Sequence, residues 1–157
     1  MTELERIAEQ LHHAVTGGAW HGPAIREVLS GLTARQAAAR PIRGGHSIWE
    51  LVLHVTSWMK MFDAALHGTP LLPWPSAAME KLDWPAVPRA DAANWKKAQR
   101  ELYAAARRLR RSIAGFAPRR MRERVPGRSF NFSHALPGIL QHTVYHSGQM
   151  ALIKKAL

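Results

Sequence analysis

Two histidines, His142 and His146, stand four residues apart near the end of the chain, a spacing that suits a metal-ion site. Side chains four residues apart in a helix project from the same face, so both imidazoles can reach one ion. Spacing alone is weak evidence, because a chain with this many histidines is expected to contain about 0.5 such pairs by chance. The pair also falls within an apolar stripe, however, which must face a core where ring nitrogens need partners. The stripe consists of Ile139, Thr143, Met150, Ile153 and Leu157.

His54 is the natural third ligand, because it lies in the middle of the most apolar helix that the sequence predicts. It shares one side of that helix with Leu51, Trp58, Met61 and Ala65. A histidine on such a face must find a polar partner. The alternative to a metal is that all three histidines are core residues, satisfied by backbone carbonyls, carboxylates or one another. Spacing and burial alone leave both interpretations open.

Few other residues are candidates for catalysis. Glu50 lies one turn before His54 and could orient its ring. The spacing from Ser47 to Glu50 instead favours a capping box, in which the carboxylate binds the start of its own helix. No general base is evident beyond Glu50 and Tyr145, so the catalytic residues stay unknown. The remaining histidines are expected at helix edges, ends or breaks: His12, His13, His21, His46, His67 and His134.

Four long helices are expected to position these residues. Capping-box pairs and terminal glycines mark several of their ends. The expected helices run from Thr2 to Gly17, from Ser47 to Gly68, from Asp91 to Gly115, and from Ser133 to the C-terminus with Pro137 in its first turn. The prediction is therefore an all-α protein, a four-helix bundle with a long crossover between the second and third of these helices.

The segments between the long helices are less regular. Residues 20–32 are expected to resume a helix after a break. Thr33 and Gln36 then indicate a short helical turn that ends before Pro41. Residues 69–90 hold five prolines and are predicted to be a connector rather than a helix. Two tryptophans are expected to anchor this connector onto the bundle: Trp74 and Trp84.

Composition limits the class of protein. The chain has 157 residues, 46% apolar and 21% charged, which fits one globular domain over residues 1–157. The absence of cysteine excludes disulfides, thiolate ligands and a cysteine nucleophile, so nitrogen and oxygen must hold any metal. The first ten residues are charged and amphipathic, unlike a secretory signal, and no segment is apolar enough to span a membrane. A cytoplasmic location is expected.

The net charge of +11 is concentrated in residues 96–128, which hold twelve Lys or Arg and two Glu. Such a block could grip nucleic-acid phosphates, although aromatic residues for base stacking are sparse within it. It could instead attract an anionic small-molecule substrate, or simply be a solvated basic face. The solvated face is the favoured interpretation, and nucleic-acid binding the least favoured.

Two segments resemble the DinB-like (DinB/YfiT) family of metalloenzymes, namely HSIWELVLHVTSW at residues 46–58 and GILQHTVYHSGQMALIK at residues 138–154. The connector around Asp83-Trp84-Pro85 and the helix entry with Trp95 are also similar. The resemblance covers most of the chain and is loose in the first and third helices. It implies a four-helix bundle, often dimeric, with one metal ligand from the second helix and two from the fourth. In this chain those residues are His54, His142 and His146.

The resemblance also indicates a function. It implies a divalent metal, either nickel, zinc or iron, and relatives that are thiol-dependent transferases and isomerases. Three neutral imidazoles leave open positions on a metal, which is typical of a catalytic site. The leading prediction is a metal-dependent thiol S-transferase that uses a low-molecular-weight thiol, with a metal-dependent hydrolase as the near variant. The alternatives are a basic protein that binds nucleic acid or another anion, and a bundle that binds metal or dimerises without catalysis.

Overall fold

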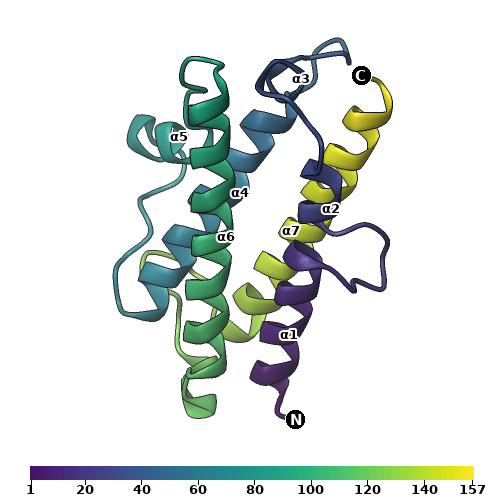
Figure 1. Ribbon diagram of the computed structural model, residues 1–157. Helices are drawn as coiled ribbons and strands as arrows, with labels where there is room; N and C mark the ends of the chain where they lie inside the picture. Colours follow the sequence, from purple (N-terminus) through teal and green to yellow (C-terminus); the bar gives the residue numbers. More distant parts are fainter.

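The computed structural model describes all 157 residues, and the chain is all-helical. Its only extended pairing is an isolated bridge between Arg124 and Asn131. Along the chain the helices are α1 (Glu3–Thr16), α2 (Ile25–Leu29), α3 (Ala34–Ala38), α4 (Ile48–Leu66), α5 (Ala77–Asp83), α6 (Ala92–Ala114), the 3₁₀ helix η1 (Pro118–Arg122) and α7 (Phe132–Lys155) (Figure 1).

Four long helices surround the core. Both α1 and α4 pack against α6, and both also pack against α7 (Figure 1). One apolar cluster joins all four, because each contributes fully buried side chains such as Leu11, Trp49, Leu109 and Leu136. This core brings α4 and α7, the two helices that carry the predicted histidine ligands, into direct contact.

None of the helices has the combination of length and hydropathy that a bilayer-spanning segment needs.

Local hydrogen bonds fix the helix starts where the sequence predicted them. Thr2, Thr33 and Ser47 each accept a hydrogen bond from the backbone three residues on, and each receives the reciprocal bond of a capping box. Asn131 caps α7, which therefore begins at Phe132, and Pro137 lies in the second turn instead of the predicted first.

The helix expected over residues 20–32 is wrong in extent, because only Ile25–Leu29 is helical. The carboxylate of Glu27 accepts the backbone N–H of Ala24 at 2.7 Å, which starts the helix there. The helix ends before Gly31, whose φ of +76° is a left-handed conformation. Trp20, which was expected inside the helix, is fully exposed.

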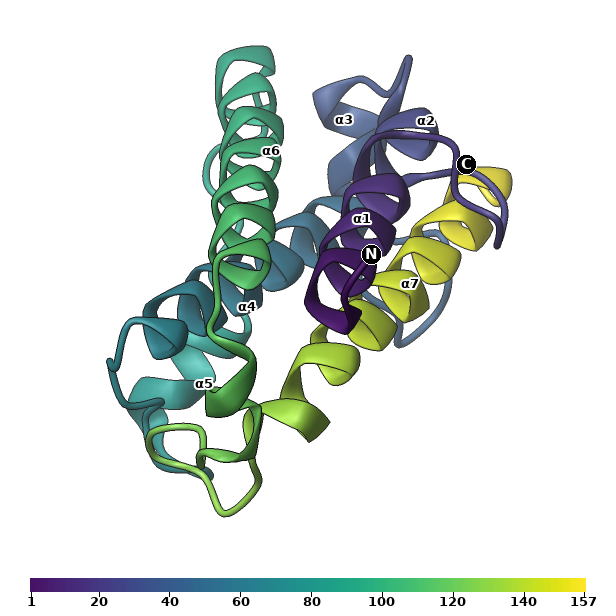
Figure 2. The same ribbon diagram turned by 90° about the horizontal axis from the view of Figure 1, so that it is seen from below.

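The connector of residues 69–90 contains a helix that the sequence analysis excluded. Residues 76–84 carry no proline, and the Ser76 hydroxyl caps the backbone N–H of Met79 at 3.1 Å. Met79 is fully buried, and α5 packs against α4 on the side away from α1 (Figure 2). Of the two tryptophans expected to anchor the connector, Trp84 does so, whereas Trp74 is 58% exposed.

The connector is tied to the loop that follows η1. The backbone N–H of Leu71 donates to the carbonyl of Pro126 at 3.0 Å, and Arg128 donates to the carbonyl of Leu72 at 2.9 Å. Gly127 makes this approach feasible, with φ of +79°. A Cβ at this position would lie 2.3 Å from the carbonyl oxygen of Leu71, which no side chain tolerates.

We therefore expect Gly127→Ala to lower the free energy of unfolding by about 2 kcal/mol or more, through backbone strain and this contact. Gly115→Ala is the matched control, because Gly115 has helical angles and a Cβ there meets only the Arg111 carbonyl at 3.4 Å. Urea unfolding of both variants measures the difference. Similar small effects in the two variants would contradict the proposed role of Gly127.

Candidate metal centre

The three histidines singled out from the sequence meet between α4 and α7. His54 Nε2 lies 2.9 Å from His142 Nε2, which lies 3.1 Å from His146 Nε2. One ring nitrogen from each histidine lies within 4.8 Å of the others. His54 and His146 are buried, and His142 is partly buried. The structure thus brings all three predicted ligand residues to one point.

Hydrogen bonds at the far side of two rings decide which nitrogen is free. His54 Nδ1 lies 2.6 Å from the backbone carbonyl of Asp83, which can only accept, so this nitrogen carries the hydrogen. His146 Nδ1 lies 2.6 Å from the side-chain oxygen of Gln149 and donates in the same way. In both neutral rings the lone pair is therefore on Nε2, pointing toward the meeting point.

His142 cannot satisfy these lone pairs by itself. If its Nε2 carries a hydrogen, this hydrogen can be directed to only one of the two facing Nε2 atoms. If its Nδ1 carries the hydrogen, the lone pairs of all three Nε2 atoms face each other without a donor between them. Without a metal, the three histidines would have to be satisfied by backbone or side-chain oxygens and by one another. That arrangement leaves at least one Nε2 lone pair without a donor. The donor set fits a divalent cation, which accepts all three lone pairs at once.

The electrostatics keep the rings in the neutral form that binds metal. Burial lowers the pKa of His142 to about 3, and the neighbouring His146 and His54 add to the shift. Burial also lowers the pKa of His54 and of His146, although Asp83 and Gln149 respectively oppose the change. All three are neutral at pH 7, so no proton has to leave before an ion binds.

Residues of the connector enclose the centre. The Asp83 carboxylate accepts a hydrogen bond from the Trp58 indole at 2.6 Å and lies 3.4 Å from His54 Nδ1. The Trp84 ring stacks on the His54 imidazole, with centroids 4.0 Å apart, and on that of His46 at 3.7 Å. The end of α5 therefore both orients the His54 ring and covers one face of it.

The sequence analysis missed Asp83 and Gln149 as positioning residues. The signal for Gln149 was available, because it follows His146 by three residues and so lies on the same helix face. Asp83 orients His54 through its backbone carbonyl. Every residue has such a carbonyl, so the amino-acid type at this position does not indicate the contact.

Two cavities open beside His142. One has a volume of about 510 Å³, and its lining combines aromatic rings with charged and imidazole groups. The other, of about 200 Å³, is mainly apolar. Trp58, Phe130 and His142 line both. The larger one is also lined by His54, Trp74, Asp83 and Arg128. A small molecule of mixed polarity can therefore reach the histidine group.

The other candidates lie elsewhere. Glu50 closes the capping box with Ser47 and pairs with Arg40, and it makes no hydrogen bond to His54. Tyr145 is 64% exposed, with its ring edge-on to that of His146 at 5.1 Å. None of the other six histidines joins the group.

The all-helical fold and the three convergent histidines together place the chain among helical proteins whose site is compatible with metal binding. The comparison with family models identifies the family. The model of the DinB superfamily matches residues 19–150, so the chain belongs to the DinB superfamily. No curated protein and no solved structure matches the chain significantly.

The lowered pKa of His142 predicts how the stability of the metal-free protein depends on pH. Between about pH 3 and pH 6.5 the unfolded chain binds a proton at this residue that the folded chain does not. The free energy of unfolding therefore falls as the pH falls below 6.5. Between pH 7 and pH 5 we expect a loss on the order of 2 kcal/mol from His142, measured by urea unfolding in the presence of a chelator.

The comparison that isolates this effect uses two glutamine variants. His142→Gln should show a smaller loss between pH 7 and pH 5 than the wild type, whereas His134→Gln, at an exposed position of α7, should retain it. An identical pH dependence in the wild type and His142→Gln would contradict the assigned shift.

Proposed function

We propose that His54, His142 and His146 hold a divalent metal ion, either nickel, zinc or iron, in a metal-dependent enzyme of the thiol S-transferase type. The convergence of three Nε2 atoms, two of them fixed as acceptors by Asp83 and Gln149, carries this proposal. Within it, the four long helices act as a four-helix bundle, residues 69–90 are its crossover, and residues 1–157 form one domain.

Neutral imidazole ligands favour catalysis over a purely structural role. They leave the full charge of the ion in place, and three protein ligands leave at least one position open. A metal in such a site lowers the pKa of a thiol or water bound to it. A thiol gives the transferase, and water gives the hydrolase that is the near variant of this proposal. The adjacent cavity of about 510 Å³ supplies space for substrate, which a site for storage alone does not need.

The residues around the larger cavity suggest the kind of substrate. Trp58, Trp74 and Phe130 offer aromatic surfaces for an apolar or flat group. Arg128 donates only to backbone carbonyls, those of Leu72 and Gly127 among them, so its charge is not neutralised by a carboxylate. We propose that Arg128 binds an anionic group of the substrate while the apolar part contacts the aromatic rings.

We assign no catalytic role to Glu50, because its carboxylate is already engaged by Ser47 and Arg40. The positioning groups are instead Asp83 and Gln149, which hold the His54 and His146 rings with Nε2 toward the centre.

Metal analysis of protein purified without a histidine tag tests the proposal. We expect about one bound divalent ion per chain in the wild type, and its loss in His142→Ala, because two ligands bind far more weakly than three. His134→Ala removes an exposed histidine of the same helix and should keep the ion. Turnover of a low-molecular-weight thiol with an electrophile should disappear in His142→Ala and persist in His134→Ala. Thiol consumption that is unchanged by this substitution would contradict the enzymatic role.

Arg128→Gln tests the substrate contact. For an electrophile that carries a carboxylate we expect KM to rise by about tenfold or more with little change in kcat, because a charge-assisted hydrogen bond is lost. The methyl ester of the same electrophile should be affected much less. Arg124→Gln, at a neighbouring exposed position, is the control. Equal effects on the acid and the ester would show that Arg128 supports the fold and not the substrate.

A further inference from the structure

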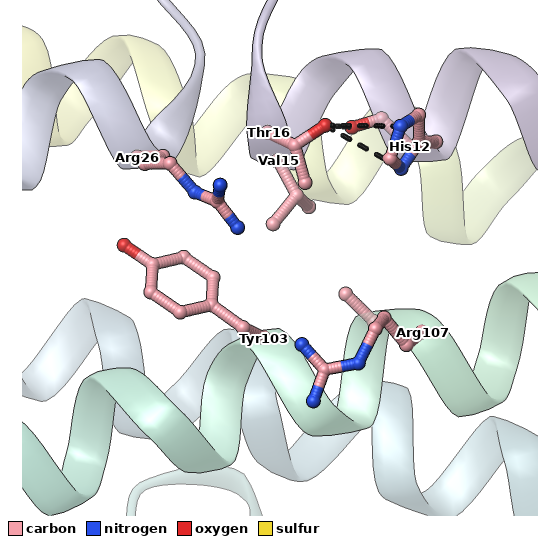
Figure 3. Close-up of a pocket in the computed structure, with 7 residues that line it drawn as sticks. His12, Val15, Thr16, Arg26, Tyr103 and Arg107 are labelled. Atoms are coloured by element: carbon pink, nitrogen blue, oxygen red, sulfur yellow. Dashed lines mark hydrogen bonds between the residues drawn. The ribbon is translucent and has the colours of Figure 1, made fainter.

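A separate cavity lies between α1, α2 and α6, with a volume of about 300 Å³ (Figure 3). It shares no residue with the metal centre or with the two cavities beside it. Its apolar lining is small, being limited to Val15 and Ala106 besides the ring of Tyr103. The other groups that line it are polar or charged: His12, Thr16, Arg26 and Arg107.

Two arginines from different helices face this space. Figure 3 shows the guanidinium of Arg26 extending from α2 toward α6, and Arg107 on α6 at the opposite wall. The Arg26 guanidinium lies over the ring of Tyr103, 4.7 Å from its centroid. This cation–π contact holds a flexible side chain in place without neutralising its charge. Arg107 stands four residues after Tyr103, on the same face of α6.

No carboxylate balances these charges. Neither Arg26 nor Arg107 takes part in an ion pair, and no acidic residue lines the cavity. Two acidic groups of the adjoining helices are engaged elsewhere: Glu9 pairs with Arg110, and Glu27 accepts the N–H of Ala24 at the start of α2. The cavity thus presents two uncompensated positive charges, with the imidazole of His12 as a further polar group in its wall.

We propose that this cavity binds the phosphate group of a small phosphorylated molecule. Guanidinium groups match phosphate oxygens through paired N–H donors, and two arginines match the charge of a dianion. Because the arginines approach from α2 and from α6, a tetrahedral anion between them can accept from both sides. A volume of about 300 Å³ admits a phosphate with a short organic group.

This site gives one part of the basic block a specific role. Nine of the twelve basic residues of segment 96–128 are exposed and make no ion pair, and they spread over α6, η1 and the following loop. Only Arg107 among these nine joins the cavity. A recessed space between helices suits a small phosphate, whereas a nucleic-acid backbone would have to contact many of the nine.

Calorimetric titration of the untagged protein, with its native metal content, tests the proposal. The probes are inorganic phosphate, pyrophosphate and a simple alkyl phosphate. We expect saturable binding at a single site in the wild type, and at least about tenfold weaker binding in Arg26→Gln and in Arg107→Gln. Arg108→Gln changes the adjacent exposed position of α6, outside the cavity, and should bind like the wild type.

Three further measurements distinguish this site from the metal centre and from an effect on folding. Thermal melting of each arginine variant should match the wild type, since all three side chains are exposed. His142→Ala should bind phosphate normally, which makes the outcome independent of the metal centre. Tyr103→Leu should weaken binding as Arg26→Gln does, whereas Tyr103→Phe, which keeps the ring, should not.

Several results would overturn the proposal. Absence of saturable phosphate binding in the wild type is one. An equal loss in Arg108→Gln would point to a diffuse basic surface. A loss in His142→Ala would place the anion at the metal centre. Tighter binding to a mixed-sequence DNA duplex than to the alkyl phosphate, with all three arginine variants equally impaired, would assign the block to nucleic acid.

Discussion

The packing of α4 against α7 is the constraint on which the site depends. His54 lies near the middle of α4, and His142 and His146 lie one turn apart on α7, so their Nε2 atoms can meet only if these turns are in contact. These turns are buried apart from the two cavities beside His142, and Val55 and Thr143 next to the ligands are inaccessible to solvent. Imidazoles are costly to bury in such a place unless each nitrogen has a partner. The polar groups around the three rings are therefore part of the fold.

The short helix α5 meets part of this need in a simple way. The last carbonyls of a helix have no partner within it, and the carbonyl of Asp83, the final residue of α5, accepts from His54 Nδ1. Trp84, the next residue, stacks on the same imidazole. The connector of residues 69–90 thus covers the centre as well as linking α4 to α6, and its carbonyl at Leu72 binds Arg128, which lines the larger cavity.

The long helices and the three histidines were predictable because their signals are local. Residues three or four positions apart are enough to identify the capping boxes at Thr2 and Ser47 and the helical spacing of His142 and His146. The family assignment is confirmed by the match over residues 19–150. The short helices were harder to place, because α2 and α5 have fewer than eight residues and depend on packing. The carbonyl of Asp83 and the pairing of Arg26 with Tyr103 are long-range contacts that no spacing in the sequence reveals.

X-ray absorption spectroscopy of the untagged protein tests the central claim most directly, because it reports the ligands of a bound ion without reference to activity. We expect three imidazole nitrogens at about 2.0–2.1 Å from the metal, with light-atom ligands completing the shell. Replacing His54 with Ala should remove one imidazole or release the ion. An ion coordinated by fewer than three imidazoles, or a spectrum that is unchanged in the His54 variant, would contradict the account.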